Sequence, residues 1–270
     1  MKVLHIMKKH PAANTAPTVS KKPQRQPPER IQKLLAQAGV GSRRQIEKWI
    51  VEGLINVNGE VAKLGDKITV RDDIKLKGRV LKLEGKLQVE TQVLIYHKPT
   101  GEIVSKNDPE GRPSVFKRLP RLDAGRWIAV GRLDLNTQGL LMFTNDGDLA
   151  NKLMHPSQQI DREYAVRVMG RIDEAMLERL VNGVALEDGT ARFEDIHESG
   201  GEGVNRWFHV VVAEGRNRLV RRLWESQECK VSRLIRVRYG SVYLPPGLPA
   251  GHHKFLDKKE VKELKRLTGL

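Results

Sequence analysis

Residues 131–147 read GRLDLNTQGLLMFTNDG, and the interpretation of the whole chain depends on this segment. It places a carboxylate, Asp134, directly after a strand-like segment and shortly before another, residues 140–144. Catalytic groups often lie in loops that a rigid strand positions. A single Asp in a loop is also a frequent turn former. These residues alone therefore leave both roles open.

The sequence on either side of this loop predicts a strand-rich domain over residues 93–251. Its strand candidates are β-branched or aromatic and end at Gly, Pro or Asp; they cover residues 93–99, 126–134, 140–144, 163–170, 208–215 and 234–244. Helical spacing marks residues 146–156, 173–183 and 217–227. Because strands and helices do not alternate regularly, we expect an α+β fold with a mixed, mainly antiparallel sheet.

A smaller module is predicted over residues 30–83. Apolar residues between 31 and 38 recur at helical spacing, and Ser42 can cap a second helix, with Gln45 completing a capping box. Asn58-Gly59 then favours a type I′ hairpin turn, because both positions of that turn need a positive φ. Five cations lie outside the apolar stripes of the two helices: Arg30, Lys33, Arg43, Arg44 and Lys48. They form either an ordinary solvated face or a surface for an anionic partner.

Three further segments complete the organisation. Residues 1–29 are rich in Pro and Lys and predict a disordered basic arm. Residues 84–92 suit a linker. Residues 252–270 form either a short helix with a modest apolar stripe or a basic tail.

Composition limits the class of partner. The 270 residues carry 48 Lys+Arg against 33 Asp+Glu, which gives a net charge of +15 and favours a polyanion. No apolar run exceeds four residues, so no membrane span is expected. The chain start has no secretory apolar region, and the single cysteine, Cys229, cannot form an internal disulfide. Both observations indicate the reducing cytoplasm.

Metal and cofactor motifs are weak or missing in the sequence. It contains no G-x-G-x-x-G and no Walker loop. Asp146 and Asp148 could form a metal pair, but the glycine between them and the helix that follows favour turn and N-cap roles. We therefore expect no metal and no cofactor.

Two stretches resemble known families. Residues 30–68, RIQKLLAQAGVGSRRQIEKWIVEGLINVNGEVAKLGDKI, resemble an S4 RNA-binding domain. GRLDLNTQGLLMFTNDG resembles the signature loop of pseudouridine synthases that modify ribosomal RNA. Three more blocks agree with that family in order: HKPTG at 97–101, REYAV at 162–166, and EGRNRLVRRLWE at 214–225 followed by SRLIRVRYG at 232–240. The combination is closest to the S4-bearing branch that acts on large-subunit (23S) ribosomal RNA.

The resemblance implies isomerisation of uridine to pseudouridine, with roles for individual residues. Asp134 becomes the nucleophile at C1′ or the base that removes a sugar proton. Arg221 becomes its ion-pair partner, an RNA phosphate contact being the alternative. Tyr164 becomes the residue that stacks on the flipped base, and Leu234 packs against that base; plain core packing is the alternative for both.

The resemblance also implies which residues bind RNA. These are Arg30, Ser42, Arg43, Arg44 and Lys48 in the first module, and Arg132, Arg216, Arg218, Arg222 and Arg236 in the second. It implies a monomer acting on ribosomal RNA, either naked or within an assembling particle. The competing hypothesis is a non-catalytic S4-type RNA-binding factor for ribosome assembly.

Overall fold

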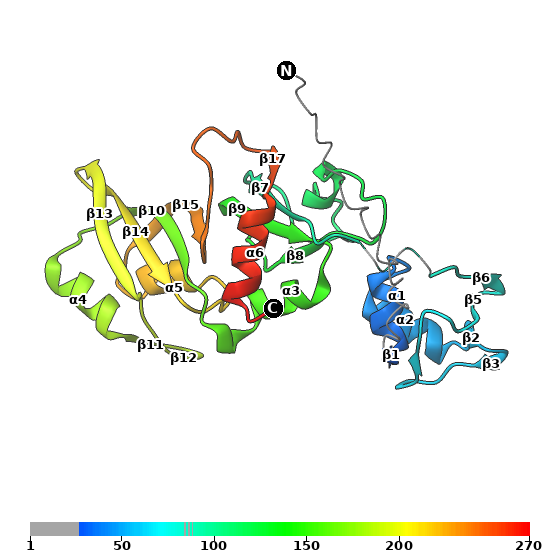
Figure 1. Cartoon of the computed structure of the whole chain (residues 1–270). Helices are drawn as coiled ribbons and strands as arrows, with labels where there is room; N and C mark the ends of the chain where they lie inside the picture. The colour runs from blue at the N-terminus through cyan, green and yellow to red at the C-terminus, as the bar shows by residue number, and fades with distance from the viewer. Residues whose placement is uncertain (1–26, 84, 86, 88) are drawn as a thin grey trace, which may run out of the picture.

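The computed structural model describes residues 27–270 except 84, 86 and 88. Residues 1–26 of the predicted disordered arm lie outside the described residues. The last residue of that arm, Glu29, forms a short strand, β1, with Arg30. The described chain folds into a small N-terminal domain and a larger domain built on one sheet (Figure 1). The predicted α+β fold with a mainly antiparallel sheet is confirmed.

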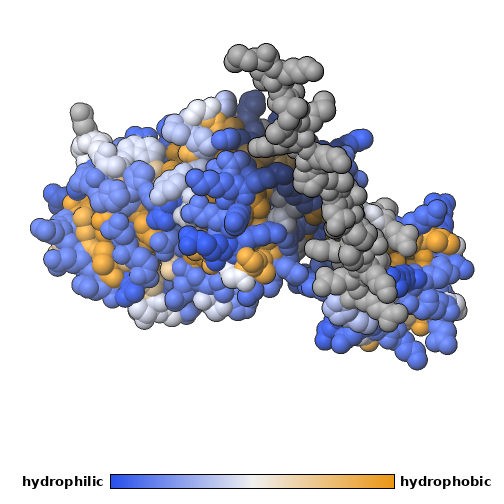
Figure 2. Space-filling view, viewed as in Figure 1, coloured by the Kyte–Doolittle hydropathy of each residue, from blue (hydrophilic) through white to orange (hydrophobic). Residues whose placement is uncertain are grey.

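The small domain packs two helices against short strands. Helices α1 (Ile31–Gln37) and α2 (Arg43–Val51) share a core with a four-stranded sheet in the order β3-β2-β5-β6. Its strands are β2 (Ile55–Val57), β3 (Glu60–Val61), β5 (Ile74–Leu76) and β6 (Arg79–Val80), while β1 pairs with β4 (Lys67–Ile68). In Figure 2 this domain presents a mostly hydrophilic surface with separate apolar patches.

Local predictions in the small domain are largely confirmed. Ser42 caps α2, since its hydroxyl accepts a hydrogen bond from the Gln45 amide at 3.1 Å. The predicted capping box of α2 is only half present, because the Gln45 side chain does not return a hydrogen bond to Ser42. Among the described residues both bonds of a capping box are found at α6 alone. Asn58 and Gly59 adopt φ values of 53° and 95°, the positive values that the predicted hairpin turn requires.

The large domain is organised by a nine-stranded sheet in the order β13-β14-β10-β15-β9-β7-β17, with β16 beside β15 and β8 beside β9. The strands are β7 (Val93–Lys98), β8 (Ile128–Val130), β9 (Gln138–Thr144), β10 (Arg162–Met169), β13 (Asp195–Glu202), β14 (Asn205–Val212), β15 (Lys230–Tyr239), β16 (Val242–Tyr243) and β17 (His253–Phe255). All pairs are antiparallel except β15 with β9. That parallel pair lies at the centre of the sheet.

Helices and a long loop cover the sheet. Helices α4 (Glu174–Asn182) and α5 (Leu219–Glu225) pack on β10, β14 and β15. Helices α3 (Gly147–Met154) and α6 (Lys258–Leu267) pack on β7 and β9. On the opposite face of β7 and β9 lies the segment 99–127, which contains a 3₁₀ turn at Val115–Arg118. A small hairpin, β11 (Val184–Leu186) and β12 (Gly189–Ala191), follows α4.

The C-terminal segment forms a helix rather than a basic tail. Asp257 and Glu260 form a capping box at the start of α6, and Leu264 is fully buried against the sheet. Strands β13 and β17 were not predicted, because DIHESGGE carries two glycines and charged residues, and HKF is short. Antiparallel pairing with β14 and β7 fixes these two strands.

The two domains touch at defined points. An added Cβ on Gly39, at the end of α1, would lie 2.7 Å from the Gly125 carbonyl oxygen, so the two backbones meet closely. Lys33 forms an ion pair of 3.1 Å with Asp148 at the start of α3. No described helix is both long enough and apolar enough to cross a membrane.

Candidate active site

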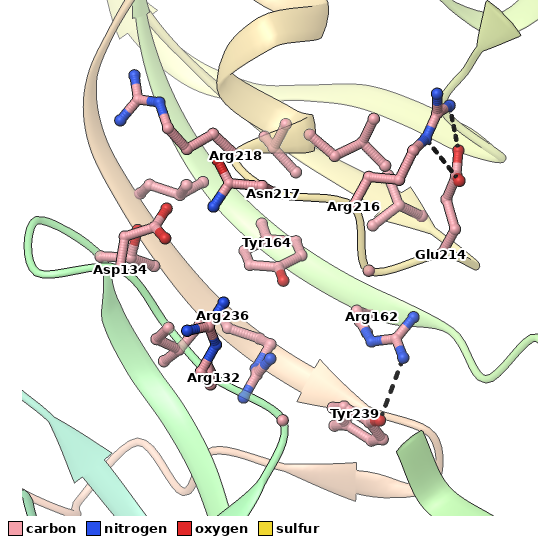
Figure 3. A pocket seen from close by; sticks show the side chains of 18 of the residues that line it. Arg132, Asp134, Arg162, Tyr164, Glu214, Arg216, Asn217, Arg218, Arg236 and Tyr239 are labelled. Carbon is pink, nitrogen blue, oxygen red and sulfur yellow. Dashed lines mark hydrogen bonds and ion pairs between the residues drawn. The ribbon is translucent and has the colours of Figure 1, made fainter. Parts of the chain in front are cut away.

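A cavity of about 680 Å³ opens at the centre of the large domain. Seven residues predicted from the sequence line it together: Asp134, Tyr164, Leu234, Arg132, Arg216, Arg218 and Arg236 (Figure 3). They come from the loop before β9, from β10, from the segment before α5 and from β15. Residues far apart in the sequence therefore meet in one site.

Asp134 lies in the loop between β8 and β9. Its carbonyl oxygen accepts a hydrogen bond from the Thr137 amide at 3.0 Å, which closes a tight turn. Its half-buried side chain lines the cavity. Asp134 thus forms a turn and also directs its carboxylate into the cavity. Its position is therefore compatible with both a turn-forming role and a catalytic role.

Arg221 does not form the expected ion pair with Asp134. Between these two described residues no guanidinium nitrogen lies within 4.0 Å of a carboxylate oxygen; instead the guanidinium donates to the carbonyls of Val231 and Asn136, each at 3.0 Å. Burial lowers the pKa of Arg221, and the charge of Asp134 acts in the opposite direction, so the two charges interact at longer range. The buried guanidinium of Arg221 therefore hydrogen-bonds to the backbone of the Asp134 loop and not to the carboxylate itself.

Lys98 is a buried cation beside the Asp134 loop that the sequence patterns did not single out. Its side chain is completely buried, and its ammonium group donates to the carbonyls of Pro99, Asp134 and Thr137 at 2.9, 3.1 and 2.9 Å. Burial lowers the pKa of this lysine to about 8. The motif HKPTG does not indicate that Lys98 is buried. Its burial follows from the pairing of β7 with β9, in which Lys98 lies opposite Gly139.

Gly139 sets the distance between the loop and β15. It has a φ of 112° and pairs in parallel with Arg236. An added Cβ would lie 2.6 Å from the Arg236 amide nitrogen and closer still to its carbonyl oxygen. Only glycine combines this positive φ with so close an approach.

Tyr164 and Leu234 line the cavity from adjacent strands. Tyr164 lies on β10 opposite Arg236 of β15, and Leu234 precedes Arg236 by two residues, so strand alternation directs all three toward the same face. Leu234 is buried, whereas Tyr164 is half-buried with its ring in the cavity.

The predicted RNA-binding arginines of this domain differ in environment. Arg216 pairs with Glu214 at 2.7 Å, and Arg218 pairs with Glu225 at 3.3 Å. Arg222 lies outside the cavity and makes two bonds to Asp188, at 2.8 and 2.9 Å. Arg132 is exposed, but Arg236 is only 2% exposed, which excludes it from an open surface.

The candidate RNA-binding residues of the small domain lie away from the cavity. Arg30, Arg43, Arg44 and Lys48 are exposed, whereas Ser42 is occupied as the cap of α2. Arg43 comes within 4.0 Å of Asp148, and Lys48 lies 3.6 Å from Glu52. These weak pairs leave the cations accessible to an anionic partner.

The D-x-D pair has the structural role that the sequence favoured. Asp146 caps α3 by accepting hydrogen bonds from the amides of Asp148 and Leu149, each at 3.0 Å. Asp148 pairs with Lys33 of the small domain. Within residues 27–270, apart from 84, 86 and 88, no group of three His, Cys, Asp or Glu side chains is arranged to hold a metal ion.

Comparison with family models gives the chain its family. A model described as RNA pseudouridylate synthase matches residues 92–226, and an S4 domain model matches residues 29–74. The chain belongs to the RNA pseudouridylate synthase family. The family match contains the Asp134 loop, Tyr164 and Arg221.

Three similar curated relatives of this chain are each named ribosomal large subunit pseudouridine synthase B. The protein from Pseudomonas aeruginosa is 57% identical over 90% of this chain, which spans 63% of that relative's length. The protein from Pasteurella multocida is 52% identical over 99% of the chain and 79% of its own length. The Escherichia coli K12 protein is 54% identical over 90% and 84%.

A solved structure agrees with the fold of the synthase. A crystal structure of a pseudouridylate synthase superposes with a TM-score of 0.61 at 24% identity. The match covers 87% of this chain and 99% of that one.

The burial of Lys98 predicts how the free energy of unfolding changes with pH. Because its pKa is lowered in the folded state, the unfolded chain binds more protons between about pH 8 and 10.5. Wild type should therefore gain stability relative to Lys98→Met as the pH rises through this window. The gain should approach about 3 kcal/mol, since one pKa unit corresponds to about 1.36 kcal/mol. Urea unfolding of both proteins at several pH values measures the difference.

Lys33 supplies the matched control for this measurement. Its pKa is raised, first by its hydrogen bond to Glu29, so the stability it contributes is lost as the pH rises through the folded-state value. The advantage of wild type over Lys33→Met should thus fall at high pH. A Lys98 difference that stays flat or falls from pH 8 to 10.5 would contradict the assigned burial of the charge.

Proposed function

We propose that this synthase converts a specific uridine of large-subunit (23S) ribosomal RNA to pseudouridine. One observation carries the proposal: the Asp134 loop, in a chain of this family, presents a carboxylate to a cavity lined by five arginines. The names of the curated relatives support the large subunit as the source of the RNA. The small domain matches an S4 model and supports RNA as the partner.

The proposed reaction rearranges one nucleotide without a net gain or loss of atoms. The N1–C1′ bond breaks, the uracil turns, and a C5–C1′ bond forms. The proton on C5 is then lost and N1 gains a proton. Because no electrons are transferred to another molecule, the proposed isomerisation requires no redox cofactor. Asp134 acts on the sugar, either as a nucleophile at C1′ or as a base that removes a sugar proton.

The other residues in the cavity position the reactants. A base in a stacked helix must leave the stack to reach a carboxylate inside a cavity. We assign the ring of Tyr164 to stacking on the extruded uracil and Leu234 to packing against it. Lys98 and Arg221 position the loop through its backbone carbonyls, at Asp134, Asn136 and Thr137. We assign the synthase to the cytoplasm, as a monomer.

Mapping of pseudouridine tests this function. Unmodified transcripts of the large-subunit and small-subunit RNA are incubated with the synthase, and pseudouridines are located by carbodiimide-induced stops of reverse transcription. New stops at one large-subunit uridine are expected. Parallel reactions with naked RNA and with partly assembled particles distinguish the two substrate forms. A chain that binds the RNA but produces no stop in either form would instead be a non-catalytic assembly factor.

The exposed cations of the small domain predict a salt dependence of RNA binding. Replacing both Arg43 and Arg44 with Ala should weaken RNA binding, because these exposed cations of α2 are assigned to phosphates. The slope of log K against log salt should become shallower by about 0.7–0.9 for each lost contact. Filter binding between low and moderate salt measures it, with exposed Arg79 of β6 replaced by Ala as the control. An unchanged slope in the double variant would exclude phosphate contacts at α2.

A further inference from the structure

The cavity contains more positive charge than its carboxylates balance. Five arginines line it against two carboxylates, those of Asp134 and Glu214. Arg216 and Arg218 are paired, with Glu214 and Glu225 respectively. Among the described residues, no carboxylate lies within 4.0 Å of the other three, which are Arg132, Arg162 and Arg236. Two of these three are buried.

Arg162 lies on β10 and Arg236 on the paired strand β15, and both are buried where they line the cavity. Arg162 is 9% exposed and donates to the Ala213 carbonyl at 3.1 Å and to the Tyr239 hydroxyl at 3.2 Å. Arg236 donates from Nε to the Leu140 carbonyl at 2.8 Å, and its Nη2 is buried with no partner. Both guanidiniums lie over the Tyr239 ring, 5.0 and 5.2 Å from its centroid.

Two buried charges without a counter-ion are costly. A buried cation needs hydrogen bonds and an opposite charge to offset the loss of its hydration. The Tyr239 ring and the three neutral oxygens provide part of this compensation, but no negative charge. An anion that enters the cavity would supply this negative charge. Its hydrogen-bond donors would be the guanidinium groups of Arg162 and Arg236, which β10 and β15 hold in position.

We propose that Arg162 and Arg236 bind a backbone phosphodiester of the RNA inside the cavity, next to the nucleotide that Asp134 acts on. This inference rests on the proposed function, because the uracil is neutral and the phosphates are the anions of an RNA substrate. Figure 3 shows Tyr164 between Asp134 and Arg162 in this view, so a base stacked on Tyr164 would have its backbone near the arginines. Guanidinium groups bind phosphate oxygens with paired hydrogen bonds.

The site has a positioning role in the reaction. A phosphodiester fixed by two rigid arginines would set the location of the adjoining ribose relative to the Asp134 carboxylate. It would also offset part of the unfavourable free energy of extruding the base. Arg132 is exposed and also lines the cavity, so it can contact the same RNA strand.

Ethylation interference tests the proposal at every phosphate of the RNA in one experiment. A large-subunit RNA fragment is ethylated at random phosphates, and the RNA bound by the Asp134→Asn protein is separated and mapped. Loss of one charged phosphodiester contact should lower binding about 10- to 100-fold. We expect one interfering phosphate to flank the uridine that wild type isomerises. That signal should disappear when Arg162→Gln is added and persist in part with Arg162→Lys.

Two further variants separate a phosphate contact from a structural role. Tyr239→Phe removes the hydroxyl that Arg162 bonds but keeps both cations, so the interference signal should persist. Arg192→Gln removes an exposed arginine outside the cavity and should leave the pattern unchanged. A Tyr239→Phe pattern that matches Arg162→Gln would assign the arginine a purely structural role.

The outcomes distinguish this proposal from the proposed function. Identical interference patterns with and without Arg162→Gln would overturn the phosphate site, even if wild type isomerises the RNA. Weaker binding of Arg162→Gln without a changed pattern would indicate a contact to the base and would also overturn it. Failure of wild type to isomerise any uridine would reject the function, whereas the comparison of patterns would still decide whether Arg162 binds a phosphate.

Discussion

Asp134→Asn is expected to abolish isomerisation while the protein stays folded and binds RNA. The amide has nearly the same shape as the carboxylate but has no negative charge, so it cannot serve as the nucleophile or the base. The contacts that hold this residue reach its backbone carbonyl, from Lys98 and Thr137, and should survive the change. We expect the single-turnover rate to fall by about 10⁴-fold or more. Nucleoside analysis of digested RNA measures the product.

An exposed carboxylate provides the control for this variant. Asp123 lies in the loop before β8 and does not line the cavity, so Asp123→Asn should keep the wild-type rate. Binding of the same RNA by Asp134→Asn should remain within about threefold of wild type, because electrostatic contacts elsewhere dominate affinity. Pseudouridine formation by Asp134→Asn at a rate near that of wild type would remove Asp134 from the reaction.

Gly139→Ala is expected to cost both stability and activity. The new methyl group would collide with the backbone of Arg236, where the central parallel pair of the sheet forms, and φ at this residue is 112°. Relief requires β9 and β15 to move apart, which shifts the loop that carries Asp134. We expect a loss of about 3 kcal/mol from overpacking and an unfavourable φ. Urea unfolding measures the stability, and tests at low temperature measure the activity of the folded fraction.

A glycine that follows β9 offers a matched control. Gly147 begins α3, and an added Cβ there would lie 3.5 Å from the Ile128 side chain, an ordinary contact. Gly147→Ala should therefore be nearly neutral. If the two alanine variants lose stability equally, the close approach of β9 and β15 does not determine the geometry of the loop.

Much of the fold follows from local sequence patterns. Apolar spacing located α1, and the Asn58-Gly59 pair fixed the hairpin of the small domain. Strand alternation also places Arg162 with Tyr164, and Arg236 with Leu234, on the face that lines the cavity.

Other features depend on packing between distant segments. Lys98 precedes a proline in a polar motif, and its burial arises only when β7 pairs with β9. Whether Arg221 reaches a carboxylate or a carbonyl depends on how α5 packs beneath the loop. The resemblance placed Arg221 near Asp134, but spacing along the chain could not indicate which oxygen its guanidinium binds. The edge strand β13 likewise forms through its pairing with β14.

Release of tritium from uracil C5 tests the central claim most directly, because formation of a C5–C1′ bond at a uridine displaces that hydrogen. Large-subunit RNA transcribed with C5-tritiated uridine is incubated with wild type and with Asp134→Asn, and small-subunit RNA serves as the comparison. We expect wild type to release tritium from large-subunit RNA up to about one equivalent, and Asp134→Asn to release none above background. No release by wild type from large-subunit RNA, naked or in assembling particles, would contradict the account.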